Sequence, residues 1–207
     1  MIIDLETFLF LGWFAVIGGL LNTFADWFLL AFPVGGQEIK LAMLAKKPAA
    51  FVRLGAYLAW IAIPMWIVIV APVSTLLRGA PYALIAIALV GMAAMAIYSL
   101  VYHVSYIFYD TAYRYTPEKV DLFTAEKSFQ RKLMTPIGLV TNVALLIGGI
   151  LSGAPWWWLV ANPLLLQVAF FFAARSTPAP IGGYFLTGAG SLSFTAFALI
   201  TMVAVFS

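Results

Sequence analysis

The chain has no cysteine, a single histidine and few charged residues. Without cysteine it cannot form disulfides, thiolate nucleophiles, iron–sulfur clusters or cysteine-ligated zinc, and its redox compartment stays undetermined. The lone histidine, His103, excludes a metal site built from several histidines, so we expect no metal and no cofactor. Charged residues make up 9% of the 207 residues, whereas about a quarter of a soluble domain is charged. A soluble globular domain is therefore excluded.

Apolar residues make up 64% of the chain. A helix needs about 20 mostly apolar residues to cross the roughly 30 Å hydrocarbon layer of a bilayer. Breaks rich in proline, glycine or charge separate apolar stretches at about 8–32, 51–77, 82–109, 136–151, 157–174 and 183–206. The sequence thus predicts an all-α polytopic membrane protein. All of residues 1–207 belong to one bundle of six transmembrane helices, and no soluble domain is left over.

The basic residues predict how the bundle is oriented. Ten of the 11 Lys and Arg side chains fall in the first, third and fifth loops, and Arg78 alone lies in the second loop. Short cytoplasmic loops carry the excess of Lys and Arg, so both termini are expected outside the cytoplasm. Trp156-Trp157-Trp158 would then anchor the bundle at the outer headgroup layer. No broad basic patch faces water, so we expect no nucleic-acid partner.

Two cytoplasmic loops have the pattern of amphipathic helices that lie on the membrane surface. Thr116-Pro117-Glu118-Lys119 reads as a capped helix start, and apolar residues recur among lysines after it. Residues 37–47 show a weaker version of the same alternation. Both patterns are typical of helices that contact anionic membrane lipid.

An acidic residue inside the first stretch and the histidine inside the third are the most informative polar groups. Burying a charge in the bilayer costs about 2.5–3.5 kcal/mol, so such groups face the bundle interior and often mark function. Asp26 lies about 9 Å from the cytoplasmic end of its stretch at 1.5 Å per residue, and His103 lies at a similar depth. We therefore expect the two side chains to meet.

A candidate site follows from this pairing. His103 and Asp26 are the candidate catalytic residues, with His103 as general acid or base and Asp26 orienting it. The candidate ligand-binding residues are the other polar side chains near the same interior: Asn22, Tyr106, Asp110, Asn142, Asn162, Gln167, Thr187 and Arg175. Polar and small residues also join membrane helices without any chemistry. That alternative stays open, and for Gly188-Ala189-Gly190 and Ser191 we favour it.

Several short motifs resemble a family. They are Ala25-Asp26-Trp27-Phe28-Leu29-Leu30, Tyr102-His103, Asn162-Pro163-Leu164-Leu165-Leu166 and Pro178-Ala179-Pro180-Ile181-Gly182. Together they are similar to an uncharacterised family of bacterial six-span integral membrane proteins, defined only as a domain of unknown function. The resemblance implies the fold and a bacterial cytoplasmic membrane, and names no substrate. One departure is Ala25, where that family often has glycine.

Three functions are compatible with these features. We favour an intramembrane polar pocket that binds or processes a small lipid-like molecule, with proton transfer as its chemistry. The second hypothesis is a non-catalytic accessory subunit or assembly factor of a larger membrane complex, because little of the chain extends beyond the bilayer. The third is a small-solute transporter that acts as a homo-oligomer. The expected partners are accordingly membrane lipid, a lipid-like molecule and further protein subunits.

Overall fold

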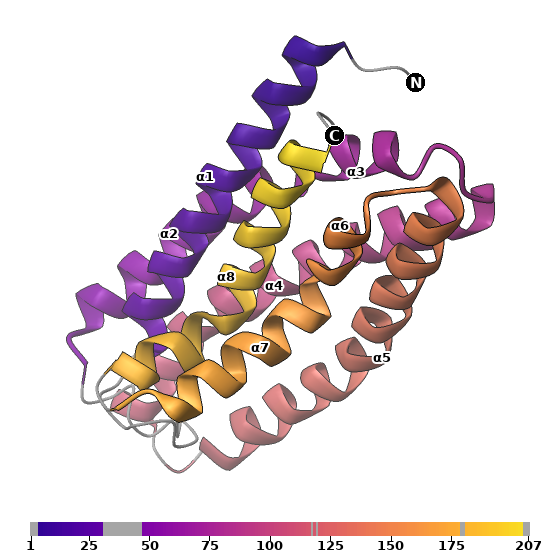
Figure 1. Cartoon of the computed structure of the whole chain (residues 1–207). Helices are drawn as coiled ribbons and strands as arrows, with labels where there is room; N and C mark the ends of the chain where they lie inside the picture. The colour runs from indigo at the N-terminus through magenta and orange to yellow at the C-terminus, as the bar shows by residue number, and fades with distance from the viewer. Residues whose placement is uncertain (1–3, 31–46, 117, 119, 179–180, 205–207) are drawn as a thin grey trace.

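The computed structural model describes residues 4–30, 47–116, 118, 120–178 and 181–204, and these residues form helices and short connections without strands. Figure 1 shows the helices lying side by side in one elongated bundle. In chain order the helices are α1 (Leu5–Leu30), α2 (Ala49–Ile67), α3 (Val70–Leu76), α4 (Tyr82–Tyr115), α5 (Val120–Ser152), α6 (Trp156–Val160), α7 (Pro163–Ser176) and α8 (Ile181–Ala204). The predicted all-α fold is confirmed.

Five helical segments of the described chain are long and apolar enough to cross a membrane. They are Leu5–Leu29, Ala49–Leu76, Tyr82–Tyr115, Ser128–Ser152 and Leu186–Ala204. Several helices of this length and composition indicate a membrane protein. The expected stretch 136–151 proves to be the second half of the much longer helix α5.

The stretch expected as a fifth span, residues 157–174, is broken into two short helices. Helix α6 ends at Val160, and α7 begins at Pro163 with Asn162 as its N-cap. Proline at the first helical position lacks the N–H that would continue the preceding helix, so the chain starts a new helix there. The 14 residues of α7 rise only about 21 Å, which is less than the hydrocarbon thickness.

Proline also explains the interruption between α2 and α3. Pro72 has no N–H for the carbonyl of Val68, and Ala71 N donates to Val68 O instead at 3.1 Å. The tighter hydrogen bond ends the regular helix at this turn, whereas Pro64 is accommodated inside α2. Of the two prolines in the expected stretch 51–77, only Pro72 therefore coincides with an interruption of the helix.

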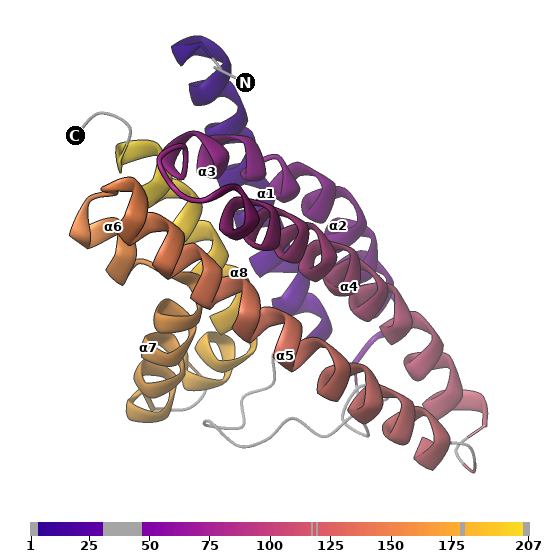
Figure 2. The ribbon, with the colours of Figure 1, turned by 90° about the vertical axis from the view of Figure 1, so that its right-hand side faces the viewer.

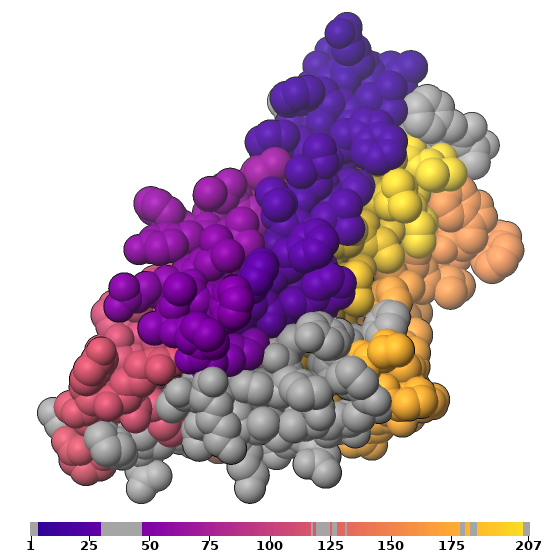
Figure 3. All heavy atoms as spheres, turned by 90° about the vertical axis from the view of Figure 1, so that its left-hand side faces the viewer, coloured from indigo at the N-terminus to yellow at the C-terminus, as the bar shows by residue number. Residues whose placement is uncertain are grey.

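Close approaches at glycine show that α1 runs antiparallel to α8 and also to α2, whose Gly55 lies against Ala25 and Leu29 of α1. Gly12 and Gly19 of α1 lie against Met202 and Thr195 of α8, and Gly18 lies against Ala62 of α2. Helices α1 and α2 share one face of the molecule, with α8 beside α1 (Figure 3). The start of α1 and the end of α8 consequently lie at one end of the bundle, near α3 and α6 (Figures 1 and 2).

The two surface helices expected from the sequence have different outcomes. The segment after Thr116 is helical, but it continues directly into α5 instead of forming a separate helix on the membrane surface. Of residues 37–47, only Lys47 belongs to the described part of the chain.

The three tryptophans expected at the outer headgroup layer differ in their surroundings. Trp156 is exposed, whereas Trp158 is buried and its Nε1 donates to Thr201 Oγ1 at 3.0 Å.

Candidate functional site

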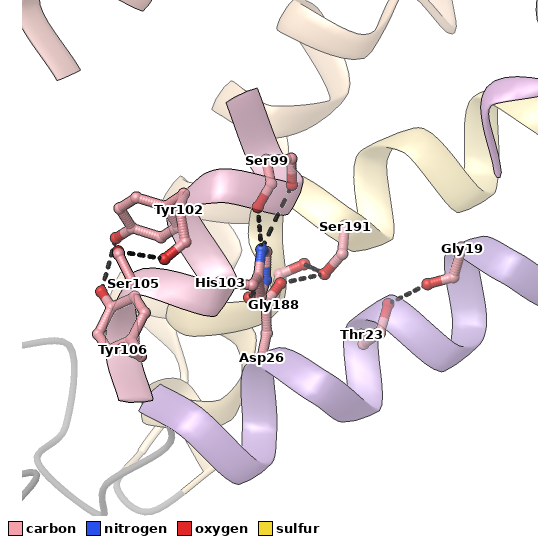
Figure 4. A network of polar contacts seen from close by, with 10 residues as sticks. All are labelled: Gly19, Thr23, Asp26, Ser99, Tyr102, His103, Ser105, Tyr106, Gly188 and Ser191. Atoms are coloured by element: carbon pink, nitrogen blue, oxygen red, sulfur yellow. Dashed lines mark hydrogen bonds and ion pairs between the residues drawn. The ribbon is translucent and has the colours of Figure 1, made fainter. Parts of the chain in front are cut away.

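Asp26 and His103 meet in the interior of the bundle, as the sequence predicts. His103 Nε2 lies 2.8 Å from Asp26 Oδ1, and the two residues are 3% and 7% exposed. Asp26 projects from α1 and His103 from α4, so helices far apart in the sequence supply the pair (Figure 4). Their proximity gives each ionisable group the partner that burial in a low-dielectric interior demands.

The surrounding atoms fix how many protons the pair holds. His103 Nδ1 lies 2.6 Å from the backbone carbonyl oxygen of Ser99, which can only accept a hydrogen bond. Nδ1 therefore carries a hydrogen. The 2.8 Å contact between Nε2 and Asp26 Oδ1 then needs a proton of its own, bound either to the ring or to the carboxyl group. In both cases the pair has no net charge and holds one proton that can shift between its members.

Ser191 of α8 completes the environment of Asp26. Its hydroxyl donates to Asp26 Oδ2 at 2.6 Å and lies 3.1 Å from the carbonyl of Gly188. The expectation that this part of α8 packs closely holds for Gly188, which lies beside Trp27 and Thr23 of α1. Sequence analysis nevertheless missed the contact of Ser191 with the carboxyl group. A signal was present, because a buried carboxylate needs more donors than one histidine supplies.

A small cavity adjoins the pair. Its volume is about 30 Å³, and it is lined by Gly19, Asn22, Ile63, Trp66, Met95, Ala96, Ser99, Ser191 and Phe194. Ser99 and Ser191 line the cavity and also contact His103 and Asp26, respectively. The pair itself is not part of the lining, so these serines separate it from the cavity. Asn22 Oδ1 is buried and has no hydrogen-bond partner among the described residues.

Two other candidate residues on α4 lie outside this site. Tyr106 lies one turn after His103 on α4 and is buried. Its hydroxyl is 2.7 Å from the hydroxyl of Tyr102 (Figure 4). Asp110 pairs with Arg114 at 2.8 Å. The carboxyl group of Asp110 is thus engaged in an ion pair on its own helix.

The Asp110–Arg114 pair belongs to a contact that joins α4 to the end of α1. Arg114 Nη2 donates to the backbone carbonyl of Lys47. Lys47 Nζ in turn donates to the carbonyls of Trp27 and Phe28 at 3.1 and 2.8 Å. Burial lowers the pKa of Lys47 to about 8, so the side chain is still mostly charged at neutral pH. A cation there interacts favourably with the C-terminal end of the α1 dipole.

Asn142 and Asn162 form a joint between α5 and α7. Asn162 Nδ2 donates to the carbonyl of Asn142 at 3.1 Å, and Asn162 Oδ1 accepts from Leu164 N at 3.0 Å. Asn142 Oδ1 lies 3.3 Å from the same amide. These hydrogen bonds account for both side chains structurally, and neither residue is among those that line the cavity.

We expect Asn162→Ala to destabilise the protein by about 1–3 kcal/mol, because α7 loses its cap and a buried carbonyl loses its donor. Thermal melting of the detergent-purified protein measures the change. Ser176→Ala is the matched control, since Ser176 is exposed and donates only within its own helix. Equal melting temperatures for the two variants would contradict the structural role of Asn162.

The remaining candidate residues, Gln167, Thr187 and Arg175, are not among the residues that line the cavity. Gln167 is exposed on α7, and Thr187 is half-buried one turn before Ser191. The guanidinium of Arg175 lies 4.5 Å from the centre of the Phe171 ring. Residues 179–180 of the Pro178-Ala179-Pro180 motif that follows Arg175 lie outside the described part of the chain.

The arrangement therefore consists of one mobile proton, two serines that contact both the pair and the cavity, and an acceptor on Asn22. Among the described residues, no group of three His, Asp or Glu side chains is placed to hold a metal ion. No family model, no curated protein and no solved structure matches this chain.

Proposed function

We propose that the protein is a multi-pass protein of a bacterial cytoplasmic membrane that binds or processes a small lipid-like molecule beside the Asp26–His103 pair. In this proposal α6 and α7 cross the bilayer together as a sixth span, and both termini lie outside the cytoplasm, as in the six-span family that the motifs resemble. Lys47, Arg53 and Arg114 lie toward the end of the bundle where α1 ends, and the proposal assigns that end to the cytoplasm.

The observation that carries the proposal is the buried 2.8 Å contact between Asp26 and His103 beside a cavity lined in part by polar residues. Asp26 is a buried acidic side chain within a candidate span, and its partners come from two other helices, α4 and α8. Packing alone does not require an ionisable pair, since apolar residues of similar size hold helices together at least as well. An ionisable pair inside a membrane protein is by default a hypothesis of function.

The chemistry of the proposal is a proton shift within the Asp26–His103 pair, which Ser191 transmits to the ligand through its hydrogen bond to Asp26. Both ring nitrogens of His103 are engaged, so a ligand in the cavity meets the hydroxyls of Ser99 and Ser191 first. When the proton moves from Nε2 to Oδ1, the hydrogen bond that Oδ2 accepts from Ser191 weakens, because the carboxyl group loses its charge. Asp26 and His103 thereby act on the ligand as positioning and proton-holding residues.

Native mass spectrometry tests the proposal. We expect the protein purified in mild detergent to retain one lipid-like molecule. Ala96→Leu places a larger side chain in the cavity wall and should abolish the adduct, whereas Ser105→Ala on the same helix should retain it. Thermal melting confirms that both variants are folded. A wild-type protein without any adduct contradicts the proposal.

The same spectra address the assembly. A stoichiometric partner protein that copurifies in place of a lipid would favour an accessory subunit, and a lipid-free homo-oligomer would favour a transporter. The proposed function predicts that the lipid adduct is lost when Ala96→Leu fills the cavity, whatever the number of subunits.

A further inference from the structure

The cavity beside the pair has the size of a small terminal group. Its volume is about 30 Å³, and a cavity needs about 10–15 Å³ by this measure to hold one water molecule. About two waters, or the carbon and oxygen atoms of a terminal CH₂OH group, would therefore fill it. An entire lipid does not fit, so the cavity can receive only the head of such a molecule.

We propose that the cavity binds the neutral hydroxyl head of a long-chain primary alcohol, with Asn22 as acceptor and Ser99 as donor. The proposal rests on the proposed function and names the class of lipid-like molecule that the site takes.

The hydrogen-bonding groups of the cavity match a hydroxyl. Asn22 Oδ1 is buried without a donor, and a buried acceptor without a partner costs about 1–3 kcal/mol. The ring nitrogen of His103 nearest to Ser99 already carries a hydrogen, so the Ser99 hydroxyl is able to donate into the cavity. Ser191 directs its hydrogen to Asp26. The ligand must then donate one hydrogen bond and accept one, as an alcohol does.

Charge excludes the commoner lipid heads. None of the residues described as lining the cavity is Lys or Arg, so a phosphate or carboxylate would be buried without a counter-ion. An ammonium group fares no better, because the Asp26–His103 pair has no net charge and Ser191 occupies Asp26 Oδ2. A neutral head avoids both penalties.

The rest of the lining suits an alkyl chain. Ile63, Trp66, Met95, Ala96 and Phe194 provide an apolar wall from three helices. Met95 is unbranched and only partly buried, and methionine changes rotamer at little cost. Its movement would let the chain of the alcohol extend from the cavity toward the bilayer.

The test compares three probes with the same chain: 1-tetradecanol, tetradecanoate and tetradecylamine. Each is added to the purified, delipidated protein, and the bound fraction is measured by native mass spectrometry. We expect tetradecanol to bind at least tenfold more tightly than the charged probes. Asn22→Leu and Ser99→Ala should each weaken the binding of tetradecanol about three- to tenfold, as expected for one hydrogen bond. Ser105→Ala is the matched serine control on α4 and should leave the binding unchanged.

The outcomes separate this proposal from the proposed function. Tighter binding of either charged probe, or equal binding of tetradecanol to wild type and to both cavity variants, overturns the alcohol site alone. An endogenous lipid adduct combined with no binding of tetradecanol does the same. The absence of both an endogenous adduct and any probe binding overturns the two proposals together. If Asn22→Leu does not fold, Ser99→Ala decides the question, because it removes only one oxygen atom.

Discussion

Replacing His103 with leucine is expected to lower the melting temperature of the purified protein by about 6–20 °C. The substitution leaves Asp26 buried opposite an apolar side chain, with Ser191 as its remaining side-chain partner. Breaking a buried ion pair by removing one member typically costs 3–5 kcal/mol. In a chain of this size each kcal/mol corresponds to a shift of about 2–4 °C.

The double variant Asp26→Leu, His103→Leu is the decisive control. Apolar residues of similar size often replace a buried pair at no cost in stability. The melting temperature of the double variant should therefore be closer to that of the wild type than to that of His103→Leu. Ser191 keeps the carbonyl of Gly188 as an acceptor in this variant. A double variant no more stable than His103→Leu would show that the shape of the imidazole, and not the uncompensated carboxyl group, determines the loss.

The two variants also separate stability from function. The double variant should be folded but has no proton to shift between a carboxyl group and an imidazole. If it retains the bound lipid-like molecule with unchanged affinity, the pair has no part in recognising that molecule. Loss of binding in a stable double variant would support a positioning role that a purely structural pair does not explain.

The pairing of Asp26 with His103 could be predicted from the sequence because few alternatives exist. A carboxyl group inside an apolar helix requires a partner, and the chain has a single histidine, at a similar depth. Burial cost and helical rise were sufficient for this prediction. The same reasoning does not predict the partners of neutral polar groups, since a serine or asparagine can form its hydrogen bonds within its own helix or with a neighbouring helix.

The asparagines illustrate this limit. Asn22, Asn142 and Asn162 look equivalent in the sequence, yet Asn142 and Asn162 bond to each other's helices whereas Asn22 borders the cavity. Which of these occurs depends on how α5, α7 and α8 pack, and hydropathy does not determine that packing. The break at Asn162, in contrast, had a local signal, because an asparagine followed by proline is typical of a helix start.

Gly18→Ala is expected to destabilise the protein by about 1–3 kcal/mol. A Cβ atom at this position would lie 2.7 Å from the carbonyl oxygen of Ala62 and 2.7 Å from the amide nitrogen of Trp66. Both are backbone atoms that cannot rotate away, so α1 and α2 would have to separate, and overpacking of this kind typically costs that much. Alanine recovers up to about 1 kcal/mol of helix propensity, which does not offset the clash.

Gly138→Ala provides the matched comparison, because its Cβ would meet only the flexible end of Met95, at 3.5 Å. We expect its melting temperature to equal or exceed that of the wild type. Gly18→Ala should also weaken the binding of tetradecanol, since Gly19 of α1 and Ile63 and Trp66 of α2 all line the cavity. If both glycine variants melt alike, α1 and α2 are not in close backbone contact. This result would also contradict the position of the cavity, which is lined by residues of both helices.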